Sequence, residues 1–225
     1  MEETVPLNSK EQATSSLVAK GISLMTEKYG DENSTGEHFL PYHNGFHARE
    51  VLDAIANIGK LAFKNGRITE NDLLLLQVTA VFHDVEQFKG AGVNEDESAI
   101  IAADEMEKTR VFTKEDVERV GRGIKATKVQ VKNGVMVQEA TDEYFTKIIC
   151  DADWFKFGAD FEIYWNRSLD YLKEVKKADK LTKEEISEFA VDQIALLERH
   201  KFFTEEAKIV FPNKEANIAR TIEFL

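Results

Sequence analysis

The sequence predicts an all-α protein, one bundle of helices over residues 1–225 with a single small β-hairpin. Three observations predict this class. Helix-forming Ala, Leu, Glu and Lys are plentiful, whereas only three prolines and 12 glycines occur. Apolar residues recur at steps of three and four along most of the chain. One segment, residues 129–137, instead alternates apolar and polar residues around Asn133-Gly134, the strongest short-range signal for a hairpin.

Capping residues give the order of the helices, because a Ser, Thr, Asp or Asn that precedes an apolar periodic segment satisfies its free N–H groups. Thr69 followed by Asp72 has the form of a capping box, and Thr182 with Glu185 repeats it. In chain order, the expected helices begin near Asn8 or Ser9, Gly45, Thr69, Asn94, Thr113, Asp142, Phe161, Thr182, Thr204 and Asn213.

The stretch Leu73–Glu86, LLLLQVTAVFHDVE, is apolar on every side of a helix and therefore belongs in the core. It ends in His83 and Asp84, two ionisable groups that are costly to bury unless they are paired or bound to a metal. We expect a divalent cation as their partner. The remaining ligands are expected from His47 and from the triplet at 151–153.

Composition excludes several classes of protein. A net charge of -12 opposes binding to a nucleic-acid backbone, although a metal and a few lysines can still attract a small anionic substrate into one cleft. The only cysteine, Cys150, cannot form an internal disulfide, and the polar start of the chain is no secretory signal. The longest apolar run is about half of a membrane span. These features predict a soluble cytoplasmic protein, and its oligomeric state stays open.

The candidate ligands lie at the ends of three helical segments. Two imidazoles and two carboxylates without sulfur suit one divalent ion, among Mn, Fe, Co, Ni, Zn and Mg, and the donor types do not choose among these metals. An ion with open positions makes water nucleophilic near neutral pH, which favours a hydrolase. A simpler interpretation of His83-Asp84 alone is a core histidine bonded to its neighbour at a capped helix end.

The order H…HD…D resembles the HD-domain superfamily of metal-dependent phosphohydrolases, over residues 42–158. Tyr42-His43-Asn44 with His47 is similar to the YHNxxH opening of cyclic-nucleotide phosphodiesterases. Phe82-His83-Asp84, together with Asn94-Glu95 and Ser98-Ala99, resembles a bacterial branch of HD phosphohydrolases. The resemblance implies a helical HD domain and an ion held by four residues, which are His47, His83, Asp84 and Asp153.

The same resemblance implies roles around the ion. His43 would protonate the leaving oxygen or, alternatively, hold a neighbouring group in place. Asp84 would also accept the proton of the attacking water, and Asp151 would support a ligand or cap a helix. Glu86 is a further candidate base, with a solvated charge at a helix end as its alternative. Trp154 is expected in the core, with stacking on a base as its alternative.

Lys125 and Lys128 follow an amphipathic helix at a segment that faces the metal in the bacterial branch, and they are candidates to bind phosphate. The alternative is that both are ordinary exposed lysines. Gln87 stands where some nucleotidases of the superfamily have a glutamate. This difference argues against the activity of those nucleotidases. Residues 85–152 contain no histidine, so one metal is expected and not two.

The sequence therefore predicts a metal-dependent phosphohydrolase that uses water activated by a single ion on a small phosphate ester, with a nucleotide as the favoured substrate. Two alternatives remain open. One is a non-catalytic nucleotide-binding or regulatory HD protein in which the metal is structural. The other is a phosphodiesterase, which the YHNxxH opening favours although no glutamine that would clamp a base can be placed from the sequence.

Overall fold

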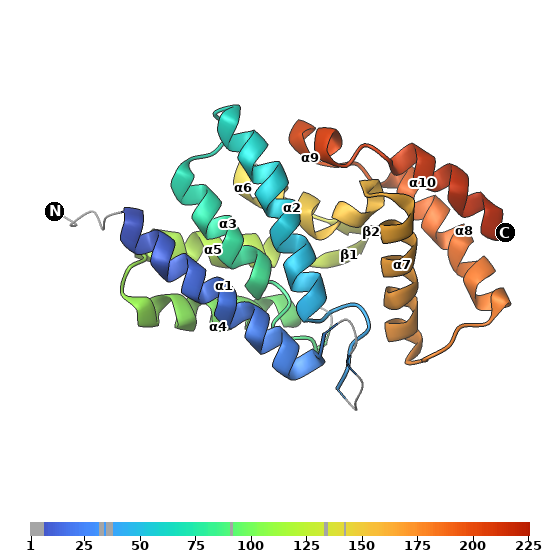
Figure 1. The fold of residues 1–225 in the computed structure, drawn as a ribbon, viewed down its shortest axis with the longest axis horizontal. Coiled ribbons are helices and arrows are strands. Elements are labelled where there is room, and N and C mark those ends of the chain that lie inside the picture. Colours follow the sequence, from blue (N-terminus) through green and yellow to red (C-terminus); the bar gives the residue numbers. More distant parts are fainter. Residues whose placement is uncertain (1–6, 32–33, 35–37, 91, 133–134, 142) are drawn as a thin grey trace.

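A computed structural model describes residues 7–31, 34, 38–90, 92–132, 135–141 and 143–225, and it confirms the all-α class (Figure 1). Within these residues, helices account for every element except a pair of short strands. The elements are α1 (Leu7–Tyr29), α2 (Gly45–Lys64), α3 (Glu70–Phe82), α4 (Asn94–Thr109), α5 (Lys114–Ala126), β1 (Val129–Lys132), β2 (Val135–Gln138), α6 (Tyr144–Asp153), η1 (Phe155–Gly158), α7 (Phe161–Lys176), α8 (Lys183–Arg199), α9 (Glu205–Val210), α10 (Lys214–Thr221) and η2 (Ile222–Phe224).

The apolar stretch forms α3, and this helix is the centre of the first half of the molecule. It packs against α1, α2, α5 and α6, so each of its faces meets another helix. Nine of its 13 residues are buried, including the polar Thr79, whose hydroxyl donates to the carbonyl of Leu75 at 2.8 Å. Because burial on every side fixes the helix, the two residues that follow it are held firmly at one place in the core.

Three capping boxes start helices, two of them at the predicted pairs. Thr69 with Asp72 begins α3, and Thr182 with Glu185 begins α8. Thr113 was expected as a cap for α5 and forms a full box with Asp116. In each box a threonine hydroxyl accepts an N–H of the first turn while the carboxylate accepts the N–H of the threonine, so two otherwise free donors are satisfied.

At two helix starts the residue expected as the cap lies inside the helix and does not precede it. The first helix begins at Leu7, before the expected caps Asn8 and Ser9. Asn94 is the first residue of α4 and does not cap it; its side-chain oxygen instead accepts the N–H groups of Lys89 and Gly90, at 3.1 and 3.0 Å. The amide thus closes the turn before the helix, a local alternative to capping that short polar side chains often use.

The hairpin is formed as predicted in its strands, where Val129 pairs with Gln138 in an antiparallel register. The expected turn residues Asn133-Gly134 lie outside the described part of the chain. A second apolar cluster joins η1, α7, α8 and α10, at the end of the molecule opposite α1 (Figure 1). No helix in the described ranges is long and apolar enough to cross a membrane.

Candidate metal centre

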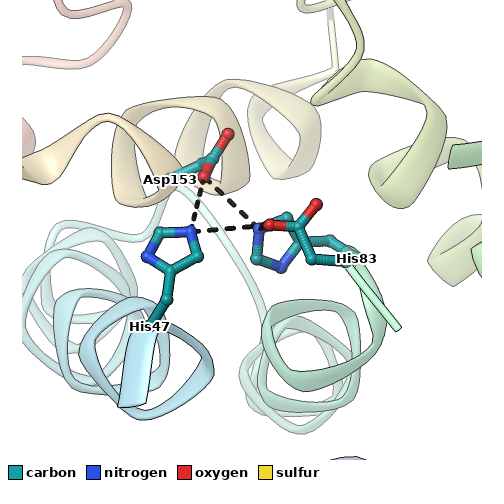
Figure 2. A group of neighbouring side chains, drawn as sticks. His47, His83 and Asp153 are labelled. Atoms are coloured by element: carbon teal, nitrogen blue, oxygen red, sulfur yellow. Dashed lines mark ion pairs between the residues drawn. The ribbon is translucent and has the colours of Figure 1, made fainter. Parts of the chain in front are cut away.

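The four predicted ligands converge in the core. His47 lies in the first turn of α2, His83 and Asp84 follow α3, and Asp153 ends α6. One ligand atom from each lies within 4.8 Å of the other three. Figure 2 shows the two imidazoles pointing toward Asp153 from separate helices. Both imidazoles are buried, and so is Asp153, so the meeting point lies inside the fold.

The spacing between these atoms is that of ligands around a shared ion. The Nε2 atoms of His47 and His83 each lie 3.3 Å from Oδ1 of Asp153. Oδ2 of Asp84 lies 3.0 Å from His83 Nε2 and 3.6 Å from His47 Nε2. Donors about 2.1 Å from one ion are about 3.0 to 3.4 Å apart in tetrahedral or octahedral geometry. Neither Nε2 makes a hydrogen bond within the described residues, so the lone pairs are left for a cation.

The imidazole of His83 is held in the tautomer that a metal needs. Its Nδ1 lies 2.7 Å from the carbonyl oxygen of Ala80, so Nδ1 carries the proton and donates. The Nε2 lone pair then faces the two carboxylates. A backbone carbonyl on the remote ring nitrogen is the usual support for a metal-binding histidine.

The start of α2 sets the position of His47. Asn44 caps the helix, and its side-chain oxygen accepts the N–H groups of Phe46 and His47. Its amide nitrogen donates to the carbonyl of Leu40 at 2.7 Å, which ties the cap to the preceding segment. Gly45 is required because a Cβ there would lie 2.1 Å from the hydroxyl oxygen of Thr26 on α1. The asparagine and glycine of the YHNxxH segment therefore both serve to place one ligand.

Each carboxylate ligand is oriented by a glutamine. The amide of Gln87 donates to Oδ1 of Asp84 at 2.9 Å, and the amide of Gln138 donates to Oδ2 of Asp153 at 2.5 Å. In both cases the other oxygen faces the imidazoles. Gln138 lies in β2, so the hairpin takes part in the centre, a role that its alternating pattern did not indicate. Such outer partners hold ligands in position and commonly affect metal affinity.

The electrostatics of the centre favour charged side chains. Burial raises the pKa of Asp153, but the imidazoles of His47 and His83 outweigh burial and hold that pKa well below its usual range. Burial lowers the pKa of His83, yet the carboxylates of Asp84 and Asp153 outweigh it and raise the pKa well above the ordinary value. The raised pKa keeps a second proton on the imidazole of His83, and a cation at the shared point would take the place of that proton.

His43 lies beside the centre, with its own carboxylate partner. Its Nε2 is 4.0 Å from Oδ2 of Asp84, and its Nδ1 forms a short contact with Oε1 of Glu174 on α7. The other oxygen of Glu174 accepts the backbone N–H groups of Tyr42 and His43, each at 2.9 Å. Burial lowers the pKa of His43, but Glu174 and Asp84 outweigh burial, so the net shift is upward. No local pattern marks Glu174, which lies 131 residues further along the chain than His43.

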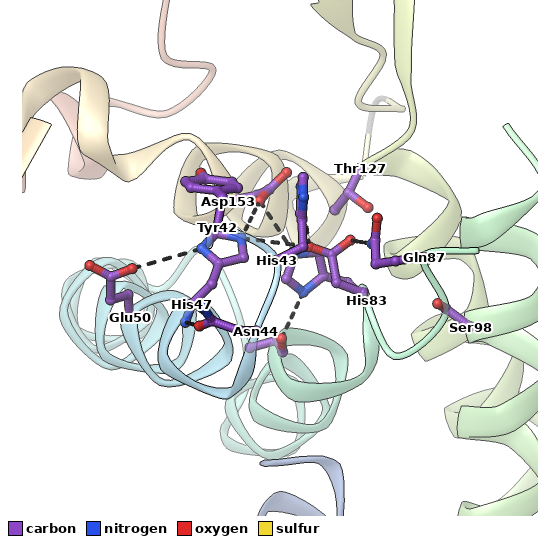
Figure 3. A network of polar contacts seen from close by, with 12 residues as sticks. Tyr42, His43, Asn44, His47, Glu50, His83, Gln87, Ser98, Thr127 and Asp153 are labelled. Atoms are coloured by element: carbon purple, nitrogen blue, oxygen red, sulfur yellow. Dashed lines mark hydrogen bonds and ion pairs between the residues drawn. The ribbon is translucent and has the colours of Figure 1, made fainter. Parts of the chain in front are cut away.

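A cavity of about 200 Å³ opens onto this centre and onto both strands of the hairpin. Figure 3 shows His43, Asp153 and Thr127 around the same space. Trp154 lines this cavity and also packs against the second apolar cluster, so its stacking on a base stays a prediction. The lining residues are Tyr42, His43, Asp84, Gln87, Gly92, Asn94, Glu95, Thr127, Val129, Met136, Asp153, Trp154, Lys156, Phe157, Tyr171, Gln193 and Leu196. Gln193, from α8, also lines the cavity and has a side-chain amide. No glutamine that would clamp a base could be placed from the sequence alone.

Three predicted site residues lie apart from the ligands. Glu86 pairs with Lys28 at 3.1 Å and accepts the N–H of Phe88 at 2.9 Å. Lys125 pairs with Asp96 at 3.0 Å on the surface. Lys128 donates to the carbonyl of Gly92 at 2.9 Å. None of these three side chains is among the residues that line the cavity, although Gly92 is.

Asp151 anchors the segment before α9. Its oxygens accept the N–H groups of Phe203 and Thr204, at 2.7 and 2.8 Å, and the hydroxyl of Thr204 at 2.6 Å. Burial raises the pKa of this carboxyl to about 6. Asp151 therefore ties the end of α6 to the segment before α9, whose N-cap is Thr204, and both of its oxygens are engaged there.

We expect Asp151→Ala to lower the free energy of unfolding by about 2 to 4 kcal/mol, because two buried N–H groups and a hydroxyl lose a shared acceptor. Urea unfolding of the variant measures this change. Elemental analysis should find the bound metal unchanged, since no ligand is removed. A loss of metal at unaltered stability would contradict this anchoring role.

The fold and the converging side chains together define an all-α protein with a buried centre of two histidines and two carboxylates, suited to a divalent cation. No protein-family model matches the sequence, and no curated protein matches it. Among solved structures, the chain is similar to a structure of LmjPDEB1 in complex with IBMX, with a TM-score of 0.63 over 96% of this chain and 84% of that chain. The two chains are 14% identical, so this likeness concerns the fold.

Proposed function

We propose that the chain is a metal-dependent phosphohydrolase of the HD type, acting on a small phosphate ester. The observation that supports it most is the convergence of His47, His83, Asp84 and Asp153 at ligand spacing, with the free nitrogen of His43 beside them. One divalent ion held by these side chains would polarise a phosphate oxygen and lower the pKa of a coordinated water. Hydrolysis then needs a proton acceptor for water and a proton donor for the leaving group.

The residues around the centre fill both roles. His43 faces Asp84 through Nε2, and the adjacent carboxylates raise its pKa, so the imidazole is ready to give a proton to an alkoxide. Glu174 acts through His43, because its contact with Nδ1 directs the other nitrogen at the cavity. Asp84 lines the cavity, and its carboxylate is the group proposed to accept the proton of the attacking water.

A nucleotide is the substrate that the cavity favours. Its lining combines aromatic rings from Tyr42, Trp154 and Tyr171 with the amide of Gln193, a set that suits a flat base with hydrogen-bonding edges. The similarity to the fold of LmjPDEB1 bound to IBMX agrees with the phosphodiesterase-like opening at residues 42–47. A phosphodiester is therefore favoured over a monoester within the same mechanism.

The test is hydrolysis by the purified chain loaded in turn with Mn²⁺, Co²⁺, Ni²⁺ or Mg²⁺. Bis(p-nitrophenyl) phosphate and p-nitrophenyl phosphate report diester and monoester cleavage, and cyclic and 5′-nucleotides follow. We expect metal-dependent turnover of the diester, lost in His43→Ala while bound metal is retained. A chain that binds metal, as elemental analysis would show, but cleaves nothing in this panel would contradict the proposal and favour the regulatory alternative.

A further inference from the structure

We propose that Lys156 is a substrate-binding residue, whose ammonium group contacts a negatively charged oxygen of the phosphate ester in the cavity. This inference rests on the proposed function. It limits the substrates of the proposed hydrolase to phosphate esters that place an anionic oxygen next to Lys156. Lys156 lies in η1, three residues after Asp153, and it lines the same cavity as Asp84 and His43.

The charge of the centre leaves a role for a positively charged side chain in the cavity. Two aspartates balance the charge of one divalent ion, so the occupied centre would be close to neutral toward an incoming anion. Glu95 also lines the cavity and adds a further carboxyl group. Apart from His43, Lys156 is the one basic side chain among the residues that line this cavity in the described structure.

The surroundings of Lys156 are unusual for a lysine. Its side chain is 6% exposed, and Nζ lies 4.1 Å from the centre of the Tyr42 ring and 5.3 Å from that of Tyr171. The ring of Phe157 lies at 5.7 Å. Three rings hold the ammonium group by cation–π attraction but cannot replace a counter-ion. A buried ammonium group of this kind is costly unless an anion meets it.

The nearby carboxylates are already engaged by other groups. Glu174 contacts His43, and Glu50 contacts Arg167 at 2.8 Å. Asp153 faces the imidazoles with one oxygen and Gln138 with the other. Within the described residues, no carboxylate lies at ion-pair distance from Nζ of Lys156. Aromatic rings therefore hold the ammonium group of Lys156 at the cavity. An anionic ligand in the cavity would supply the counter-ion that the described residues do not.

This arrangement distinguishes Lys156 from the two lysines that the sequence favoured. Lys125 is paired on the surface with Asp96, and Lys128 is bonded to the carbonyl of Gly92. Neither lines the cavity, whereas Lys156 does. Burial followed by the charge of Arg167 lowers the pKa of Lys156 to about 7, which agrees with a lysine that lacks an anion of its own.

The test compares Lys156→Met and Lys156→Arg with the wild-type chain, using inorganic phosphate as the probe. Titration calorimetry on metal-loaded protein measures phosphate affinity, and hydrolysis of bis(p-nitrophenyl) phosphate gives KM and kcat. We expect Lys156→Met to weaken phosphate binding and raise KM at least about 10-fold, with kcat changed less than about 3-fold. Lys156→Arg should recover most of the affinity because it restores the charge.

Lys60→Met is the matched control, since Lys60 is an exposed lysine on α2. It should leave phosphate affinity and KM unaltered. Thermal unfolding and metal content establish that Lys156→Met folds and keeps its ion. The proposal is overturned if phosphate affinity in that variant stays within twofold of the wild type. Should the wild type bind phosphate but hydrolyse nothing, the proposed function fails while the calorimetric comparison still decides the role of Lys156.

Discussion

Asp84→Ala is expected to abolish both bound metal and hydrolysis, with turnover lowered at least about 10³-fold. The reason is that Asp84 supplies the oxygen that lies 3.0 Å from Nε2 of His83, and the same carboxylate faces His43. Its removal takes away a ligand, half of the negative charge that balances the ion and the proposed acceptor of the proton from water. Elemental analysis and the diester assay measure the two losses.

The control for this substitution is Asp53→Ala, which removes an exposed carboxylate from α2 and should change neither quantity. Metal binding also stabilises the folded state, because the ion binds only the assembled site. A chelator should therefore lower the thermal midpoint of the wild type and leave that of Asp84→Ala unchanged. If the variant keeps its metal and its turnover, the assignment of this centre is wrong.

The sequence was sufficient to predict that the four candidate ligands meet, because each lies beside a strong local signal. His83 and Asp84 follow an apolar run that only Gln77 and Thr79 interrupt, and His47 follows an asparagine that caps its helix. The end of α6 places Asp153 in the same way. These signals fix where the helices end, and in a bundle packed around α3 those ends meet. The fold class and the convergence of these four side chains could be predicted together for this reason.

The surrounding groups could not be predicted, because no local pattern marks them. Glu174 is one of several acidic residues on an amphipathic helix, and only the packing of α7 brings it to His43. Gln138 is the polar residue that ends the short strand VMVQ, and nothing in that strand sets it apart. Lys156 follows a phenylalanine in a short 3₁₀ turn. Conversely, Lys125 and Lys128 belong to the segment that was expected to face the metal. Their side chains instead contact Asp96 and the carbonyl of Gly92.

Glu174→Gln is expected to lower kcat by about 10² to 10³-fold while leaving bound metal and KM nearly unchanged. Glu174 contacts Nδ1 of His43 with one oxygen and accepts two backbone N–H groups with the other. The glutamine can keep the backbone bonds through its carbonyl oxygen. Its amide nitrogen donates, however, and therefore opposes a proton on Nδ1 and removes the negative charge that stabilises the imidazolium form of His43.

This loss should depend on the leaving group, which separates proton donation from a general disturbance of the site. A phenyl ester expels a more basic oxygen than a p-nitrophenyl ester, so it needs the proton of His43 more. Glu174→Gln should then slow the phenyl diester more than the p-nitrophenyl diester. Glu162→Gln, on the exposed face of the same helix, is the matched control and should slow neither. Equal losses for both esters would mean that Glu174 only shapes the segment around Tyr42, and that the proton comes from another group.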